Sequence, residues 1–294
     1  MKRVNVDVMN QQNGLYLVDR TPFSGAGFMV GAQREVRSFQ MKDGIFAGAY
    51  RPLCADDAIG LAQLDVTGLL CDEENAQYPL PESIETFSGI GYEFQNGHCI
   101  HEILFCRGAV VCDCWWLKSG LLVGYNRIGD IYHHYDWYSS GVLKSATVSC
   151  GESFSGMLGF LEDGRLRALT LQGDFFSNLP DIFRTTSFFP VEKKEGLALL
   201  KGAESVYLSR NCIDDSVIEL MATSGSFDET TTLKFNDTNI GSRAASILSA
   251  LKNLKTLSIE SPDASQRVIA ENIMERRPDM NATFILTRAY PRIG

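Results

Sequence analysis

The stretch TPFSGAGFMVG at residues 21–31 contains a short phrase that the chain uses three times. Phe-Ser-Gly returns in FSGIGYEFQNG at residues 87–97 and in FSGMLGFLEDG at residues 154–164. In each copy, aromatic or aliphatic residues lead on to a later glycine, at Gly31, Gly97 and Gly164. Repetition of this kind is typical of a fold built from stacked copies of one small unit.

Each phrase predicts a strand, a tight turn and a second strand. Asn96-Gly97 and Asp163-Gly164 are dipeptides that favour the positive φ angles of a two-residue hairpin turn. The stretch after each turn alternates as a strand with one buried face does. Because one hairpin cannot bury its apolar face alone, we expect the hairpins to stack into a β-rich array. The alternating stretches are residues 34–39, 98–105 and 165–171.

The hairpin pattern resembles the MORN repeat, in particular the variant found in bacterial toxin-antitoxin-associated proteins. The shared features are an aromatic-x-Gly start, an Asn-Gly-like turn and a following strand, over residues 15–180. The first copy departs from the pattern because no Asn or Asp precedes Gly31, and an insertion without repeat character interrupts the array. The resemblance implies a β-rich repeat domain over residues 1–190, with an acidic insertion at about 53–86.

The second half of the chain contains a different sequence repeat. AESVYLSRNCI at residues 203–213 can be laid over the consensus L-x-x-L-x-L-x-x-N-x-L, and TTTLKFNDTNI at residues 230–240 repeats the match. LKTLSI at residues 254–259 begins a third copy, and Phe284 and Leu286 mark a fading fourth. This pattern resembles the leucine-rich repeat. The segments between the matches predict helices, because each has one apolar face: residues 214–221, 242–251 and 264–277.

The expected fold class is therefore α+β. A β-rich, MORN-like hairpin array at residues 1–190 precedes a short leucine-rich-repeat α/β arc at residues 196–294. In such an arc, side chains between the consensus apolar positions point away from the core, and we predict that they contact a partner. These residues are Tyr207, Ser209, Lys234, Asn236, Thr256 and Ser258.

The formal net charge of −9 is concentrated in residues 52–97, which contain acidic residues but no Lys or Arg. Such a surface repels phosphate groups, so the sequence disfavours binding to nucleic acid or to an anionic membrane, and it favours a basic protein partner. The alternative is a solvated region that only keeps the chain soluble. The acidic residues predicted to contact a partner are Asp72, Glu73, Glu74, Glu82 and Glu85.

Aromatic residues are densest near residues 115–138, which hold all three tryptophans. Some of these side chains fill the core, and others are candidates for interface anchors. The predicted anchors are Trp115, Trp116, Tyr135 and Trp137.

The same region holds most of the chemistry-bearing side chains. A zinc site is conceivable there, but Cys-x-Cys also fits a buried alternating strand, and no C-x-x-C pair is present. We favour burial of these side chains and expect no metal or other cofactor. The cluster comprises His98, Cys99, His101, Cys106, Cys112, Cys114, His133 and His134.

No catalytic motif fits the chain. CGESFSG at residues 150–156 has Ser155 where a nucleophile elbow needs glycine, and no phosphate-binding loop motif is present. We therefore expect no enzyme activity. The N-terminal residues lack the apolar run of a signal peptide, and no stretch reaches the length of a membrane span, so we expect a cytoplasmic protein with reduced thiols.

Two repeat-like halves, an acidic charge and the lack of a catalytic motif favour a protein that binds another protein. The resemblance to the toxin-associated MORN variant implies an immunity protein or antitoxin of bacterial competition, which would bind a cognate, basic toxin domain and block its active site or its access to substrate. One alternative is a general adaptor or scaffold without a toxin partner. A less favoured alternative is a zinc-dependent protein.

Overall fold

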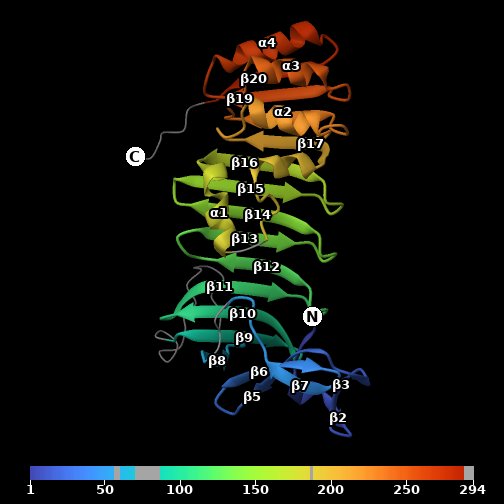
Figure 1. The fold of residues 1–294 in the computed structure, drawn as a ribbon, viewed down its shortest axis with the longest axis vertical. Coiled ribbons are helices and arrows are strands. Elements are labelled where there is room, and N and C mark those ends of the chain that lie inside the picture. Colours follow the sequence, from blue (N-terminus) through green and yellow to red (C-terminus); the bar gives the residue numbers. More distant parts are fainter. Residues whose placement is uncertain (56–59, 70–86, 186–187, 288–294) are drawn as a thin grey trace. The chain divides into compact units, whose positions relative to one another are not determined.

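The computed structural model describes residues 1–55, 60–69, 87–185 and 188–287. Over these ranges strands predominate and helices are few, so the predicted α+β class is confirmed (Figure 1). The chain divides into two compact units. The first unit is Met1–Gly129 with Asp136–Gly141, and the second is Asp130–Tyr135 with Val142–Gly294.

Nearly all elements of the first unit are strands, and η1 (Val6–Val8) is a single 3-10 turn. The strands are β1 (Arg3–Asn5), β2 (Asn10–Gln12), β3 (Leu15–Val18), β4 (Thr21–Pro22), β5 (Gly25–Val30), β6 (Val36–Lys42), β7 (Ile45–Ala49), β8 (Ala62–Asp65), β9 (Gly89–Gln95), β10 (His98–Cys106), β11 (Ala109–Trp116) and β12 (Leu122–Arg127).

Strands of the first unit close into a ring. Strand β1 runs parallel to β5, which pairs with antiparallel β6, and β8 runs parallel to β9, which pairs with antiparallel β10. Two short contacts join these groups, because Val4 of β1 pairs with His98 of β10 and Glu35 pairs with Leu64 of β8. Strand β7 extends the sheet from β6, β11 and β12 extend it from β10, and β2, β3 and β4 form a separate small sheet.

The first Phe-Ser-Gly phrase, at the start of β5, binds the turn between β6 and β7. The Gly44 N–H donates to the Phe23 carbonyl at 2.8 Å, and the Asp43 N–H donates to the Ser24 hydroxyl oxygen at 2.8 Å. Asp43 and Gly44 both have positive φ, as a two-residue hairpin turn requires. A Cβ on Gly25 would lie 2.3 Å from the Lys2 carbonyl oxygen, so only glycine lets β1 approach β5.

The second copy has the same geometry. The Gly108 N–H donates to the Phe87 carbonyl at 2.8 Å, and the Arg107 N–H donates to the Ser88 hydroxyl oxygen at 2.9 Å. A Cβ on Gly89 would lie 2.3 Å from a carbonyl oxygen of the parallel neighbour β8. In both copies, the glycine of the phrase therefore lets a parallel strand lie close on one side. The phenylalanine and serine bind the turn at the end of the antiparallel strand on the other side.

A buried ion pair joins β1 to β10. Arg3 and Glu102 are 1% and 0% exposed, and the Arg3 guanidinium pairs with the Glu102 carboxylate and donates to the Tyr50 hydroxyl. The guanidinium carbon also lies 4.4 Å from the centre of the Trp116 ring and 5.5 Å from that of Phe28. Burial by itself lowers the pKa of Arg3, but the Glu102 carboxylate together with Cys99 and Tyr50 outweighs that effect, so the pKa lies above its ordinary value and the guanidinium stays charged.

Strand β13 (Tyr132–Trp137) contains the point at which the two units divide. The second unit continues with an antiparallel group, β14 to β16, and then a parallel group, β16 to β20. Its strands are β14 (Leu143–Cys150), β15 (Phe154–Phe160), β16 (Leu166–Gly173), β17 (Gly202–Ser209), β18 (Thr232–Asn236), β19 (Thr256–Ser261) and β20 (Asn281–Leu286). Its helices are α1 (Phe175–Thr185), η2 (Lys194–Leu199), α2 (Asp215–Thr223), α3 (Ser242–Ala250) and α4 (Gln266–Arg276).

The third Phe-Ser-Gly phrase lies where the antiparallel hairpins end. Phe175 occupies the position that a turn glycine holds in the first two copies, and helix α1 begins there. The Phe175 ring covers Gly156 and contacts the Phe154 ring, with 6.3 Å between ring centres. The predicted boundary at residues 190–196 does not coincide with the division into units, because β17 pairs in parallel with β16 and continues the same sheet.

In the parallel group, a helix follows each of β17, β18 and β19. Val206, Leu233 and Leu257 stand in register on these strands and are fully buried, as the alternating pattern predicts. Asp214 caps the N-terminus of helix α2, because its carboxylate accepts the Val217 N–H at 2.9 Å. Figure 1 shows α2, α3 and α4 together on one face of this sheet. Within the described residues, no helix has the length and apolar character needed to cross a bilayer.

We expect Glu102→Gln to lower the free energy of unfolding of the first unit by roughly 3 kcal/mol, because it leaves the Arg3 charge buried without a counter-charge. Urea unfolding followed by tryptophan fluorescence measures this loss, since all three tryptophans belong to the first unit. Asp181→Asn, which breaks the exposed pair with Arg184, is the control and should leave the urea midpoint unchanged. Equal effects of the two substitutions would contradict the importance of burial.

The glycines of β15 offer a matched pair of substitutions. A Cβ on Gly156 would lie 2.1 Å from Phe175, whereas a Cβ on Gly159 would meet its nearest neighbour at 3.6 Å. We expect Gly156→Ala to destabilise the chain by about 1–3 kcal/mol through overpacking, and Gly159→Ala to be tolerated. Urea unfolding followed by circular dichroism tests the difference, and a tolerated Gly156→Ala would refute this account of the third phrase.

Candidate functional site

One face of the parallel sheet in the second unit carries no helix of the described chain. Side chains on the opposite face, such as Leu208 and Phe235, are buried beneath the helices. On the helix-free face, which we call the open face, Tyr207, Lys234 and Ser258 stand in register on β17, β18 and β19. The structure therefore brings three of the predicted partner-binding residues into one row.

The other predicted residues of this group lie in the neighbouring rows. Thr256 is in register with Thr232 of β18 and is half-buried. Asn236 is in register with Glu260, and its amide donates to the Glu260 carboxylate at 3.3 Å. Tyr207 is 37% exposed and Lys234 is also exposed, so this row offers an aromatic ring and an exposed cation side by side.

Two of the predicted contact residues are not available on a surface. Ser209 is only 5% exposed, because the row of the open face beside β16 is closely packed and its hydroxyl lies 2.7 Å from the Thr170 hydroxyl. Tyr135 is fully buried, with its ring 5.6 Å from the Phe188 ring and its hydroxyl 3.2 Å from Nδ1 of His133. The prediction that these two residues contact a partner is corrected on this ground.

The remaining aromatic candidates lie in the first unit. Trp115 is 41% exposed and stacks on the His101 ring at 3.5 Å between ring centres. Trp116 is half-buried because it packs over Arg3, and Trp137 is also half-buried. The acidic candidates Asp72, Glu73, Glu74, Glu82 and Glu85 lie outside the described residues.

Most side chains of the predicted cysteine and histidine cluster are buried, and His133 and His134 belong to the second unit rather than the first. Cys99, Cys112 and Cys114 are at most 1% exposed, whereas Cys106 is exposed. In the described part of the chain, no group of three or more His, Cys, Asp or Glu side chains is placed to hold a metal ion. His101 instead lies between two carboxylates, 3.5 Å from Glu93 and 3.7 Å from Asp113.

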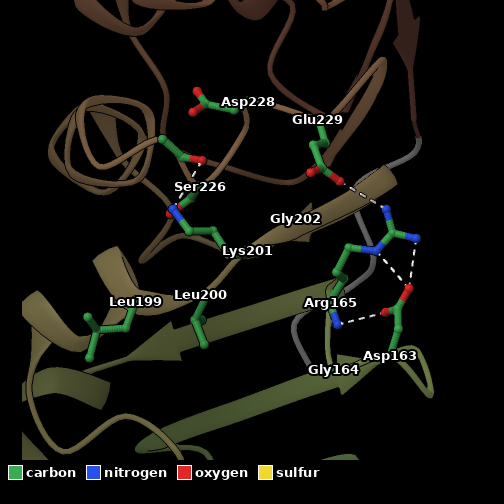
Figure 2. A pocket seen from close by; sticks show the side chains of 11 residues that line it. Asp163, Gly164, Arg165, Leu199, Leu200, Lys201, Gly202, Ser226, Asp228 and Glu229 are labelled. Atoms are coloured by element: carbon green, nitrogen blue, oxygen red, sulfur yellow. Dashed lines mark hydrogen bonds and ion pairs between the residues drawn. The ribbon is translucent and has the colours of Figure 1, made fainter.

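A pocket of about 490 Å³ opens in the second unit, beside the start of β17 (Figure 2). Its lining comes from the turn between β15 and β16, the segment before β17 and the loop after α2. Figure 2 shows Arg165 between two carboxylates, Asp163 and Glu229, with Asp228 standing apart from this network. The lining residues are Asp163, Gly164, Arg165, Leu199, Leu200, Lys201, Gly202, Gly225, Ser226, Asp228 and Glu229.

Sequence reasoning missed this pocket and part of the open face. The pocket depends on loops that are distant in the sequence, and no local pattern marks them as neighbours. Met157, which is 39% exposed on β15, and Glu260 also belong to the open face. The alternation along β15 and β19 would have signalled that these side chains share a face, but the order of the strands was needed to join them.

Comparisons with known proteins leave the family open. No protein-family model matches the chain, and no curated protein matches it. A solved structure titled "Crystal structure of GtfA/B complex bound to UDP and GlcNAc" contains a chain that is similar at 13% identity over 85% of this chain, with a TM-score of 0.20. This chain spans about half, 52%, of the length of that one, and a likeness of this size supports no conclusion about fold or function.

We expect the stability of the first unit to fall at alkaline pH. Burial raises the pKa of the Cys99 thiol to about 12, and burial also raises the pKa of Cys54 and Tyr92. A thiol in the unfolded chain ionises near pH ~8.5, so the contribution of Cys99 is complete below that pH and is lost as pH rises toward 12. For Cys99 alone the loss is roughly 3 kcal/mol by about pH 10.5.

Urea midpoints from circular dichroism at neutral and alkaline pH measure this effect. Cys99→Ala should flatten the dependence on pH, whereas Cys106→Ser, at an exposed thiol, should leave it unchanged. Equal pH dependence in the parent chain and Cys99→Ala would contradict the assignment.

Proposed function

We propose that this chain is a protein-binding scaffold whose open face contacts the partner. The observation that carries the proposal is the row of Tyr207, Lys234 and Ser258 on a sheet face without a helix. Tyrosine supplies a large contact area at low entropic cost, and polar residues around it supply hydrogen bonds. A flat row of this kind suits another protein better than a small substrate, which needs a concave site.

We further propose that the partner is a toxin domain and that the chain is an immunity protein or antitoxin. The support is the resemblance of the hairpin array to toxin-associated MORN variants, together with the net charge of −9, which attracts a basic partner. An inhibitor needs about 800 Å² of complementary surface and no chemistry of its own. The strand–helix units, interpreted as a short leucine-rich-repeat arc, supply the rigid face for this contact.

The test begins with capture of partners by the tagged chain in cells of its source organism, followed by mass spectrometry. We expect a toxin domain at stoichiometric yield, and we expect co-expression of the chain to restore growth of cells that carry the toxin. A stoichiometric partner without toxicity would favour the adaptor alternative, and failure to recover a partner would contradict both.

Variants of the open face then locate the contact. Tyr207→Ala should weaken binding about tenfold or more, since it removes an aromatic anchor. Lys234→Glu should tighten binding, since it replaces a cation that a basic partner repels by an anion that it attracts. Lys252→Glu makes the same charge change at an exposed lysine in the loop after α3 and should bind as the parent does. Calorimetry measures the affinities. Unchanged binding by both open-face variants would place the contact elsewhere.

A further inference from the structure

We propose that the pocket beside β17 binds a basic side chain, arginine or lysine, which the partner protein supplies. This inference rests on the proposed function, because it names the partner group that enters one site on the scaffold. The pocket volume of about 490 Å³ lies within the roughly 300–1,000 Å³ typical of ligand sites. The pocket therefore has ample room for one long side chain.

Both cationic side chains of the pocket, Arg165 and Lys201, already form hydrogen bonds within the chain. Arg165 donates through Nε to Asp163 at 2.8 Å and through one terminal nitrogen to Glu229 at 3.2 Å. Lys201 donates through Nζ to the Ser224 carbonyl at 3.2 Å, and it lies 3.5 Å from the Gly225 carbonyl, at the C-terminal end of α2. The partial negative charge of that helix end holds the ammonium in place. An anionic ligand would have to displace these contacts.

One carboxylate of the pocket, that of Asp228, is available to a ligand. The Asp228 backbone carbonyl accepts a hydrogen bond from the Asn253 side chain, but its carboxylate forms no ion pair or hydrogen bond among the described residues and is exposed at the pocket (Figure 2). Three carboxylates, on Asp163, Asp228 and Glu229, face two cations that are both held internally. The electrostatic balance therefore favours a cation as the incoming group.

An apolar side chain stands at the same pocket. Leu199 is 83% exposed, the largest exposed fraction among the large apolar side chains of the described chain. The methylene stem of an arginine or lysine can pack on such a surface while its charged end reaches a carboxylate. The combination of Leu199 with Asp228 thus matches both parts of a basic side chain.

The first test uses a small probe, so that it does not depend on finding the partner. Titration of the full chain with N-acetyl-arginine amide should shift the NMR amide signals of Gly202, Gly225 and Ser226, with a dissociation constant in the millimolar range. The citrulline analogue has nearly the same shape without the charge and should produce no such shifts. Equal shifts with citrulline, or none with the arginine probe at about 50 mM, would overturn the proposal.

Variants provide the second test. Asp228→Asn should weaken binding of the arginine probe about threefold or more, an effect that salt should also produce by screening. Glu271→Gln removes an exposed carboxylate from α4 and should leave probe binding unchanged. If Asp228→Asn and Glu271→Gln weakened binding equally, the effect would reflect net charge and the proposal would fail.

Affinities of the variants for the captured partner distinguish this inference from the proposed function. Loss of affinity in Asp228→Asn, beyond any loss in Glu271→Gln, supports the pocket contact. Full affinity in Asp228→Asn together with loss in Tyr207→Ala would refute the pocket contact and leave the scaffold function standing. If no partner is found, the probe titration still decides whether the pocket accepts a basic side chain.

Discussion

The buried ion pair between Arg3 and Glu102 is the constraint around which the first unit is built. Two charges removed from water are stable only when each satisfies the other, so β1 and β10 must meet at one place. Three aromatic rings, on Phe28, Tyr50 and Trp116, surround the guanidinium and exclude water from it. Because β1 also pairs with β5, this contact ties the two halves of the strand ring together.

The repeated Phe-Ser-Gly phrase is a second constraint on how neighbouring strands pack. In the first two copies, glycine permits close approach of a parallel strand, and the preceding serine and phenylalanine bind the turn at the end of the following antiparallel strand. In the third copy, Phe175 covers Gly156 and the chain turns into helix α1. The same three residues thus support continuation of the hairpins twice and their replacement by strand–helix units once.

In the second unit, the two faces of one sheet differ in burial. Leu208, Leu233 and Ile259 supply burial on the face beneath the helices. The open face carries polar and aromatic side chains, of which Tyr207 and Lys234 are exposed, and it is the face that we propose contacts the partner. The pocket adds charged groups at the start of β17, where loops rather than strands decide the chemistry.

The sequence by itself determined the type and approximate limits of about half of the elements, because turn dipeptides and apolar alternation act over a few residues. Thus β10, β16 and helices α2, α3 and α4 lie close to their predicted ranges. Only the tertiary structure decided which strands are neighbours, since pairing joins residues far apart in the chain. That is why Arg3 and Glu102 went unnoticed, why Tyr135 and Ser209 are buried rather than available for binding, and why the charges around Asp228 form a pocket.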